Sequence, residues 1–294
     1  MFTQIRREDI AWLKELLWKT EQYGCDYSVA NLYGWAPTYQ TQIARVGGFA
    51  AIRYEMPGIG GCYVCPAGAG DFGAALSALL SDARERGEEQ IRVICDAAQK
   101  ESFPEAFTAE RREDLDDYLY NAEHFIALEG SHYSAKRNFI SQFRREYDNW
   151  RFEPMTRDNR ADCLAVADAW RLLHGGEMAP DLAHEFAAIE RMLDAMEELS
   201  LLGGLLYVGK RPIAFALGSC PRPGLFNVHI EKAYADYRGA YAMIAREFAA
   251  YAREQTPFER INREEDLGFE NLRRAKLSYH PERMDEKYIL TAPV

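Results

Sequence analysis

The chain has 294 residues, a length that suggests two domains of ordinary size. Hydrophobic residues make up 48% of the sequence and charged residues 28%, which provides apolar material for packed cores and excludes a disordered chain. The formal net charge of −11 disfavours DNA and nonspecific binding to anionic membranes, although it is compatible with a local basic groove.

Cysteine usage and hydropathy favour a cytoplasmic protein. The chain has six cysteines and no leader of basic residues followed by an apolar run, which fits a reducing compartment. The apolar run Leu199–Val208 is interrupted by Ser200 and by two glycines, well short of the roughly 18 residues that a membrane-spanning helix needs. We therefore expect no membrane-spanning segment.

The first half of the chain indicates a mixture of helices and strands. Ile10, Leu13 and Leu17 recur at helical spacing and predict a helix over residues 8–20. Asp71 can cap a second helix that ends at Gly87. Runs rich in β-forming residues predict strands at Gln42–Val46, Phe49–Glu55, Cys62–Cys65, Gln90–Cys95 and Glu123–Leu128. The charged run Arg111–Asp117 is expected to be a solvated face.

The second half follows a helix over Ser134–Asp148, which has an apolar seam and a basic face and is expected to connect two domains. From Arg151 onward the predicted order is β-α-α-β-β-β-α-β-α-β. After a short strand near Phe152, the elements are Asn159–Leu173, Leu182–Glu197, Leu201–Val208, Pro212–Gly218, Leu225–Glu231, Gly239–Glu254, Phe258–Asn262, Glu270–Ser278 and Lys287–Thr291.

This order resembles the GNAT (Gcn5-related N-acetyltransferase) fold. The most telling segment is Asn271-Leu-Arg-Arg-Ala-Lys-Leu-Ser-Tyr279, which looks like the late helix of that family, and Gly60–Ile94 looks similar to the middle of a second unit. Two such units joined by a basic helix resemble the catalytic domain of phosphatidylglycerol lysyltransferases and, less closely, the Fem-type aminoacyl transferases. The strings around Asp117–Asn121, Lys136–Phe139 and Asn262–Gly268 resemble an uncharacterised bacterial family allied with that domain.

The resemblance implies a fold of the α/β (α+β) class with two tandem GNAT-like units, each a mixed sheet flanked by helices. We expect a degenerate N-terminal unit over residues 1–130, the connecting basic helix over residues 131–150, and a C-terminal unit over residues 151–294 that carries the active site.

In an acetyltransferase of this fold, the pyrophosphate of coenzyme A binds the N–H groups at the start of a long helix, where unpaired donors and partial positive charge gather. The matching residues here are Arg238, Gly239 and Ala240, but Tyr241 and Met243 stand where the family pattern has small residues. Such bulky side chains obstruct a phosphate, so the sequence disfavours acyl-CoA and no cofactor is required. An ordinary helix start is the alternative reading.

An aminoacyl-tRNA donor would not need that pyrophosphate-binding helix start. A tRNA acceptor end could follow a local basic track, although solvated helix faces explain the same residues equally well. The track consists of Lys136, Arg137, Arg144, Arg145, Arg273, Arg274 and Lys276.

Acyl transfer also needs a route for protons. Tyr279 matches the position of a proton donor to the leaving group, and His229 and Glu231, which share one face of a strand, are candidate bases. Each also has a structural reading, as a packed aromatic or as a hydrogen-bonded strand residue.

Further candidates bind the substrate. Glu264, Glu265 and Asp266 follow a strand at its C-terminal end, where sites of open sheets gather, and could hold an ammonium group; an acidic loop is the alternative. The family strings add Asn262, Asn271, Tyr120, Lys136, Arg137 and Asn138.

The pair Cys62 and Cys65 has no second Cys or His pair at zinc spacing, so no metal site is expected. Phosphate-loop, nucleophile-elbow and dinucleotide motifs are also missing from the sequence. The sequence thus favours an acyl or aminoacyl transferase acting on an amine or hydroxyl of a small molecule or lipid headgroup. An acetyl-CoA-dependent N-acetyltransferase and an inactive ligand-binding or regulatory protein remain as alternatives.

Overall fold

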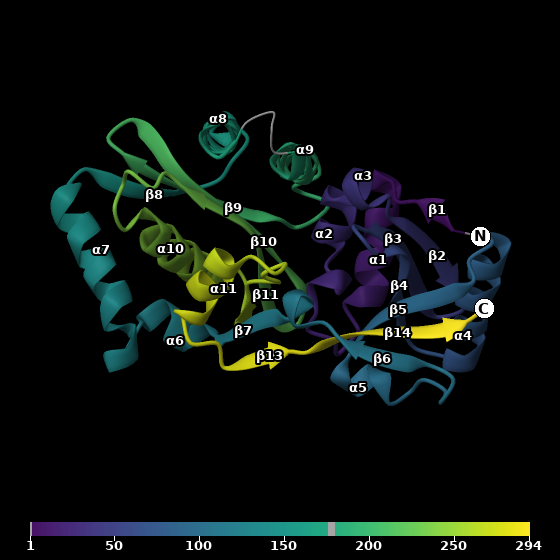
Figure 1. The fold of residues 1–294 in the computed structure, drawn as a ribbon. Coiled ribbons are helices and arrows are strands. Elements are labelled where there is room, and N and C mark those ends of the chain that lie inside the picture. The colour runs from purple at the N-terminus through teal and green to yellow at the C-terminus, as the bar shows by residue number, and fades with distance from the viewer. Residues whose placement is uncertain (1, 176–179) are drawn as a thin grey trace. The chain divides into compact units, whose positions relative to one another are not determined.

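The computed structural model describes residues 2–175 and 180–294, which divide into two compact units (Figure 1). Unit 1 comprises Met1–Tyr118, Glu264–Lys276 and Arg283–Val294. Unit 2 comprises Leu119–Arg263 and Leu277–Glu282. The strands form two seven-stranded sheets.

The sheet of unit 1 has the order β1-β2-β3-β4-β5-β14-β6. Its neighbours pair antiparallel, except that β4 and β5 run parallel at Tyr63–Val93 and Val64–Ile94. The strands are β1 (Thr3–Gln4), β2 (Gln42–Val46), β3 (Phe49–Met56), β4 (Gly60–Gly68), β5 (Gln90–Asp96), β6 (Thr108–Arg111) and β14 (Lys287–Pro293).

The helices of unit 1 begin at recognisable caps. The carboxylate of Asp71 accepts a hydrogen bond of 3.1 Å from the backbone N–H of Ala74 and so caps α4. The helices are α1 (Ile10–Leu17), α2 (Val29–Gly34), α3 (Ala36–Tyr39), α4 (Phe72–Glu85), α5 (Ala97–Lys100) and α11 (Glu270–Leu277), the last of which belongs to this unit up to Lys276.

Strand alternation explains how the sheet of unit 1 is buried on both faces. Tyr63 and Cys65 pack in one core cluster with Leu79 of α4. Their neighbours Cys62 and Val64 are equally buried and therefore point to the opposite face, because successive strand residues alternate. The two cysteines of the Cys-x-x-Cys string thus face opposite sides of the sheet, and both are free thiols, so they cannot bind one metal ion together.

The second sheet has the order β13-β7-β12-β11-β10-β9-β8. Its strands are β7 (Asp117–Asn121), β8 (Trp150–Pro154), β9 (Leu202–Val208), β10 (Arg211–Arg222), β11 (Gly224–Ala233), β12 (Phe258–Asn262) and β13 (Arg283–Asp285). Within unit 2, α8 (Arg160–Leu173) and α9 (Pro180–Asp194) lie on one face of the sheet and α10 (Ala240–Gln255) on the other (Figure 1). The remaining helices are α6 (Ala122–Ala127) and α7 (Ser134–Glu146). The predicted class, two tandem GNAT-like units with mixed sheets, is confirmed.

The parallel pair β11 and β12 separates part-way along its length. The strands are paired only from Gly224–Phe258 to Asn227–Asn262, after which β11 continues to Ala233 beside β10 alone. The two parallel strands therefore splay apart beyond Asn227. It leaves side chains near the end of β11 and just after β12 facing an opening in the sheet.

The strands of the two halves are exchanged. The C-terminal strand β14 pairs with β5 and β6 in the sheet of unit 1, whereas β7, from the first half of the chain, pairs with β12. The predicted boundaries at residues 130 and 150 differ from this division: α7 lies inside unit 2 and residues 283–294 lie in unit 1.

Two local predictions were wrong. Glu123–Leu128 lies mostly in helix α6 rather than a strand, because Asn121 accepts a hydrogen bond from the backbone N–H of His124 and caps the helix. The run Arg111–Asp117 is not a solvated face: Asp116 and Asp117 are buried, and Asp116 pairs with Arg111. None of the helices in the described ranges combines the length and apolar character needed to cross a lipid bilayer.

Candidate functional site

Tyr279 lies in unit 2 among aromatic and basic side chains. Its ring stacks on that of Phe125, with centroids 4.8 Å apart, and the Tyr120 ring meets it edge-on at 6.5 Å. The ammonium nitrogen of Lys136 lies 3.8 Å from the centroid of the Tyr279 ring, and the guanidinium carbon of Arg263 lies 4.9 Å from it. We call these five residues the Tyr279 cluster. It unites three predicted site residues with Phe125 and Arg263, which the sequence analysis did not single out.

Glu231 joins this cluster through Arg263. Nη2 of Arg263 donates to Oε1 of Glu231 at 2.9 Å, and only 12% and 10% of the two side chains are exposed. Glu231 lies beyond the point where β11 and β12 separate, and Arg263 directly follows β12. The ion pair therefore crosses the opening between the splayed strands, so a base role for Glu231 would compete with its pairing to Arg263.

The hydroxyl of Tyr279 is suited to remain protonated. Burial raises the pKa of Tyr279, although Arg263 opposes the shift. Its backbone is held as well, because the Tyr133 hydroxyl donates to the Tyr279 carbonyl oxygen at 3.1 Å. At neutral pH this side chain can donate a proton or a hydrogen bond, but it cannot act as a base.

Lys136 has the opposite electrostatic environment. It projects from α7 and its ammonium donates to Oγ of Ser278 at 2.7 Å. Burial and, secondly, the charge of Arg263 lower the pKa of Lys136 to about 8, against a smaller raising effect of Glu231. A substantial share of Lys136 is therefore neutral at mildly alkaline pH.

His229 and Asn262 belong to the sheet interior. His229 is 9% exposed, and its Nε2 lies 2.8 Å from Oγ of the buried Ser219. Asn262 is fully buried and lies between Asn227 of β11 and Leu119 of β7 in the strand register. Asn262 therefore lies in the paired part of the sheet, whereas His229 is buried at the register shift between β10 and β11, beyond the last pair of β11 with β12.

The next two predicted residues lie on α7. Nη1 of Arg137 donates to the carbonyl oxygens of Leu128 and Gly130, at 2.5 and 2.6 Å, and so ties α7 to the segment before it. Asn138 is exposed. Arg137 therefore stabilises the connection between α6 and α7 through these hydrogen bonds.

The start of α10 is closely packed by α7. Gly239 has φ +91°, and a Cβ atom built there would lie 2.5 Å from the carbonyl oxygen of Phe139 and 3.0 Å from Cβ of Phe143. Ala240 is buried, while the guanidinium of exposed Arg238 lies 6.0 Å from the Phe139 ring centroid. The predicted pyrophosphate-binding residues thus touch α7 on one side.

The two bulky residues of this helix start have different environments. Met243 is fully buried, whereas Tyr241 is 41% exposed and its hydroxyl accepts a hydrogen bond of 3.0 Å from Nε1 of Trp170. Met243 therefore packs into the core, whereas Tyr241 lies at the surface beside Trp170.

The acidic loop Glu264–Asp266 lies in unit 1. Asp266 is fully buried and accepts hydrogen bonds from Tyr118 (2.6 Å), from Nε of Arg273 (2.8 Å) and from the backbone N–H of Gly268 (2.8 Å). Burial would raise the pKa of Asp266, but the bonds from Arg273 and Tyr118 lower it. Asp266 is thus a charged anchor of its own loop.

The other members of the loop are held in different ways. Oε1 of Glu264 accepts from Nδ2 of Asn31 at 2.8 Å, and the ammonium of buried Lys276 donates to the carbonyl oxygens of Glu264, at 3.0 Å, and Glu265. Asn271 is exposed at the start of α11. The loop is therefore held by hydrogen bonds to residues within unit 1.

Lys287, the first residue of β14, lies at the centre of a buried charge cluster in unit 1. Its ammonium forms ion pairs with Asp26 and, at 2.7 Å, with Asp117, it lies 3.3 Å from Oε1 of Glu265, and its side chain is only 3% exposed. Burial lowers the pKa of Lys287, but the surrounding carboxylates, Asp117 and Asp26 first, raise it well above its ordinary value. Burial in turn raises the pKa of Glu265 to about 8 despite the opposing charge of Lys287.

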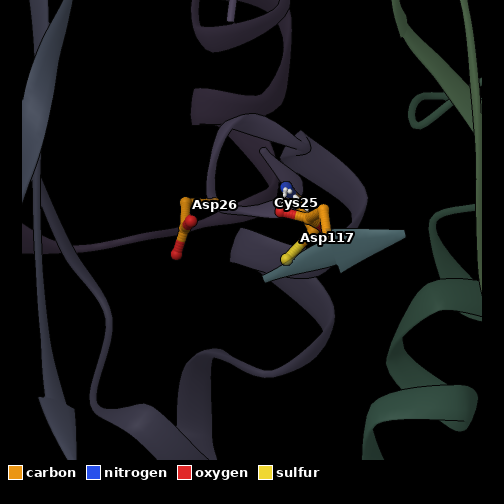
Figure 2. Close-up of side chains that lie close together, drawn as sticks. All are labelled: Cys25, Asp26 and Asp117. Carbon is orange, nitrogen blue, oxygen red and sulfur yellow. Dashed lines mark hydrogen bonds between the residues drawn. The ribbon is translucent and has the colours of Figure 1, made fainter. Parts of the chain in front are cut away.

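Three of these neighbours resemble a metal-binding set. Cys25, Asp26 and Asp117 bring their ligand atoms within 4.8 Å of one another (Figure 2). However, the ammonium of Lys287 already pairs with both carboxylates, and burial strongly raises the pKa of the Cys25 thiol. A cysteine binds a metal ion as its thiolate, which the raised pKa of Cys25 disfavours. The three side chains therefore fit the ammonium of Lys287 better than a metal ion.

Sequence analysis missed this Lys287 cluster (Cys25, Asp26, Asp117, Glu265 and Lys287), except for Glu265. Its members come from four distant segments, and each is an ordinary charged or small residue in its local pattern. The only local signal was the charged run before β7, whose last residue, Asp117, is fully buried.

Several side chains of the predicted basic track pair with groups of the protein itself. Lys276 binds two carbonyl oxygens, and Arg273 binds Asp266. Arg144 pairs with Glu247 at 3.0 Å. Arg145 and Arg274 are exposed, and Arg274 lies 3.5 Å from Glu270. Only part of the track is therefore presented as surface charge.

A depression of about 540 Å³ lies elsewhere in unit 2, on β8, β9 and the start of α8. It is lined by Arg151, Glu153, Asp162 and Tyr207, among others, and by none of the predicted site residues.

Comparison with known proteins identifies the family of the chain. The profile of the family described as "Phosphatidylglycerol lysyltransferase, C-terminal" matches residues 18–291. A search of curated proteins finds no match. Among solved structures, a conserved protein of unknown function from Bacteroides thetaiotaomicron is 33% identical, with a TM-score of 0.92 and coverage of 99% of both chains.

Two more distant structures share the fold. The C-terminal domain of a putative lysylphosphatidylglycerol synthetase from Agrobacterium fabrum is 16% identical, with a TM-score of 0.67 over 98% of this chain and 93% of that one. FemX is 10% identical, with a TM-score of 0.64 over 100% of this chain and 97% of that one.

Proposed function

Because this chain belongs to the family of the phosphatidylglycerol lysyltransferase C-terminal domain, we propose that it transfers an acyl group, with aminoacyl-tRNA as donor, to an amine or hydroxyl acceptor. The observation that carries the proposal is the Tyr279 cluster with Glu231 at the splay between β11 and β12. It gathers a protonated phenol, a lysine of lowered pKa and a buried guanidinium in one place.

Each of these groups has a task in acyl transfer. The Tyr279 hydroxyl, kept protonated by burial, would give a proton or hydrogen bond to the leaving oxygen of the donor ester. The guanidinium of Arg263, held by Glu231, would stabilise negative charge that develops on the carbonyl oxygen. Lys136, with its pKa near 8, would accept the proton of the attacking acceptor.

The start of α10 favours an aminoacyl ester over acyl-CoA as the donor. There the Phe139 carbonyl approaches Gly239, and Met243 and Tyr241 occupy the positions where the family pattern has small residues. This packing argues against a bound coenzyme A pyrophosphate, whereas an aminoacyl ester on a nucleotide does not require that cradle.

Transfer from charged tRNA tests the proposal. A panel of tRNAs carrying radiolabelled amino acids is incubated with the protein and a lipid or small-amine extract, and labelled product is resolved from free amino acid. Tyr279→Phe should fold normally and lose about 10²-fold or more in rate, the effect typical of general acid assistance. Tyr147→Phe, which removes a hydroxyl that donates to exposed Glu146, is the matched control and should keep full activity.

Binding of acetyl-CoA, followed by acetyl transfer, would contradict the proposed aminoacyl-tRNA donor. Calorimetry should detect no binding in the micromolar range. A dissociation constant of about 1 μM, equal to roughly −8 kcal/mol, with acetyl transfer to an amine and no transfer from charged tRNA, would replace the aminoacyl donor by acetyl-CoA.

A further inference from the structure

Lys136 is half-buried, and it differs from the buried lysines Lys276 and Lys287 in what surrounds its ammonium group. Lys287 pairs with three carboxylates and Lys276 with two carbonyl oxygens. Within the described ranges Lys136 forms no ion pair; it faces the Tyr279 ring at 3.8 Å, the charge of Arg263 and, more weakly, that of Glu231. A lysine in such a place pays a desolvation cost without a compensating anion, which is the usual situation of a lysine that acts as a base.

Among residues 2–175 and 180–294, the hydrogen-bond partner of this ammonium is a hydroxyl. Oγ of Ser278 lies 2.7 Å from Nζ of Lys136, a normal distance for an N···O hydrogen bond. Ser278 directly follows α11 and is exposed, while Lys136 is half-buried beside it. A reagent can therefore reach the hydroxyl from solvent, with the amine of Lys136 directly beside it.

We propose that Ser278 and Lys136 form a nucleophile and base pair, in which the Ser278 hydroxyl attacks the carbonyl carbon of an activated acyl ester and carries the acyl group as a serine ester. A serine with an adjacent general base is the usual form of an activated hydroxyl nucleophile, and lysine serves as that base in known variants of the arrangement. The acyl substrate rests on the proposed function, whereas the reactivity of Ser278 does not depend on it.

The step balances without any further reactant. Nζ of neutral Lys136 accepts the proton of the Ser278 hydroxyl as the bond between Oγ and the carbonyl carbon forms. The bond from that carbon to the leaving oxygen of the donor then breaks, and the proton passes to that oxygen. The acceptor amine or hydroxyl attacks the serine ester in the second half, loses its proton to Lys136, and the Ser278 hydroxyl is restored. In this scheme Lys136 serves the serine first and the acceptor second.

The surroundings set the pH at which the pair works. Arg263 and burial disfavour the charged lysine and Glu231 partly restores it, so the pKa of Lys136 is lowered to about 8. The reactivity of Ser278 should therefore rise with pH and level off above about pH 8.

An alkyl fluorophosphonate tests the pair directly, because it reacts with activated serines and needs no natural substrate. The intact protein is labelled between pH 6 and 9.5, and the modified residue is located by peptide mass spectrometry. We expect one label, on Ser278, that is abolished by Ser278→Ala. Lys136→Arg keeps a positive charge that cannot be lost near neutral pH, and should slow labelling by about 10²-fold or more.

The controls separate activation from exposure. Ser81 is also exposed and lies 3.4 Å from Glu85 rather than beside a lysine, so it should remain unlabelled. Lys19→Met removes an exposed lysine that pairs with Glu15 and should leave labelling unchanged. Equal labelling of Ser278 and Ser81 in the unaltered protein, no label on Ser278, or an unchanged rate in folded Lys136→Arg would overturn the proposal. Labelling of Ser278 without transfer from charged tRNA would retain the pair and reject the proposed donor.

Discussion

Nζ of Lys287 lies 2.7 Å from Oδ2 of Asp117, so the first residue of the last strand of the chain is bonded to the first residue of β7. Both side chains are almost fully buried, and the same ammonium also binds Asp26 and Glu265. A single lysine therefore joins the N-terminal segment, β7, the acidic loop and the C-terminal strand within unit 1.

Replacing Lys287 by methionine should strongly destabilise the protein. The variant leaves Asp117 and Asp26 buried without their cation, and loss of one partner of a buried pair typically costs about 3–5 kcal/mol. Urea unfolding would measure the change. Lys19→Met breaks an exposed pair with Glu15 and should change the free energy of unfolding by less than about 1 kcal/mol. Similar small effects of both substitutions would contradict a central role for Lys287.

Glu265 should make stability depend on pH. Its pKa in the folded protein is about 8, above the value of about 4.3 for an unfolded glutamate, so the folded state binds more protons between these values. Its contribution is fully present below about pH 4 and is lost as the pH rises through about 8.

The variant Glu265→Gln isolates this contribution. The free energy of unfolding of the unaltered protein should fall with rising pH relative to the variant, by at most about 1.4 kcal/mol per pH unit. Urea unfolding from pH 5 to 8 provides the comparison, and parallel pH profiles would show that Glu265 titrates as it does in the unfolded chain.

Replacing Asp266 should lower the stability of the fold rather than weaken substrate binding. Asp266→Asn weakens the charge-assisted bonds from Arg273 and the short bond from Tyr118, so it should lower stability more than the loss of the Tyr118 hydroxyl alone. Tyr118→Phe removes one of these bonds and should cost about 1 kcal/mol. Thermal unfolding of the two variants tests this order; an unchanged melting temperature with weakened substrate binding would restore Asp266 to its predicted role at the substrate.

The close approach of α7 to α10 should make Gly239 intolerant of a side chain. Gly239→Ala places a Cβ 2.5 Å from a backbone oxygen at φ +91°, and should cost more than the roughly 1–2 kcal/mol of left-handed strain alone. Gly224→Ala has φ +78° with nothing within 4 Å of the new Cβ, and measures that strain by itself. Equal losses of stability in the two variants would mean that α7 yields easily at this point.

The amino-acid sequence by itself determined most of the elements. Hydrophobic spacing located α1, α10 and the strands β2 to β5 to within a few residues, because these patterns repeat the periods of helix and strand. It failed at Glu123–Leu128, where β-forming residues are outweighed by the cap at Asn121. A single side-chain hydrogen bond at the start of a segment can thus override the propensities of the residues that follow.

Only the tertiary structure decided which strands pair and which charges are buried. No local pattern distinguishes β14 as a strand of the first sheet, because the choice depends on the edges that β5 and β6 leave available after folding. Similarly, Tyr279 and Lys136 were predicted separately, but Phe125, Arg263 and Ser278 entered the site through contacts between distant segments. Lys287, Asp26 and Asp117 read locally as ordinary solvated residues, and their burial follows from mutual neutralisation, which exists only once three segments meet.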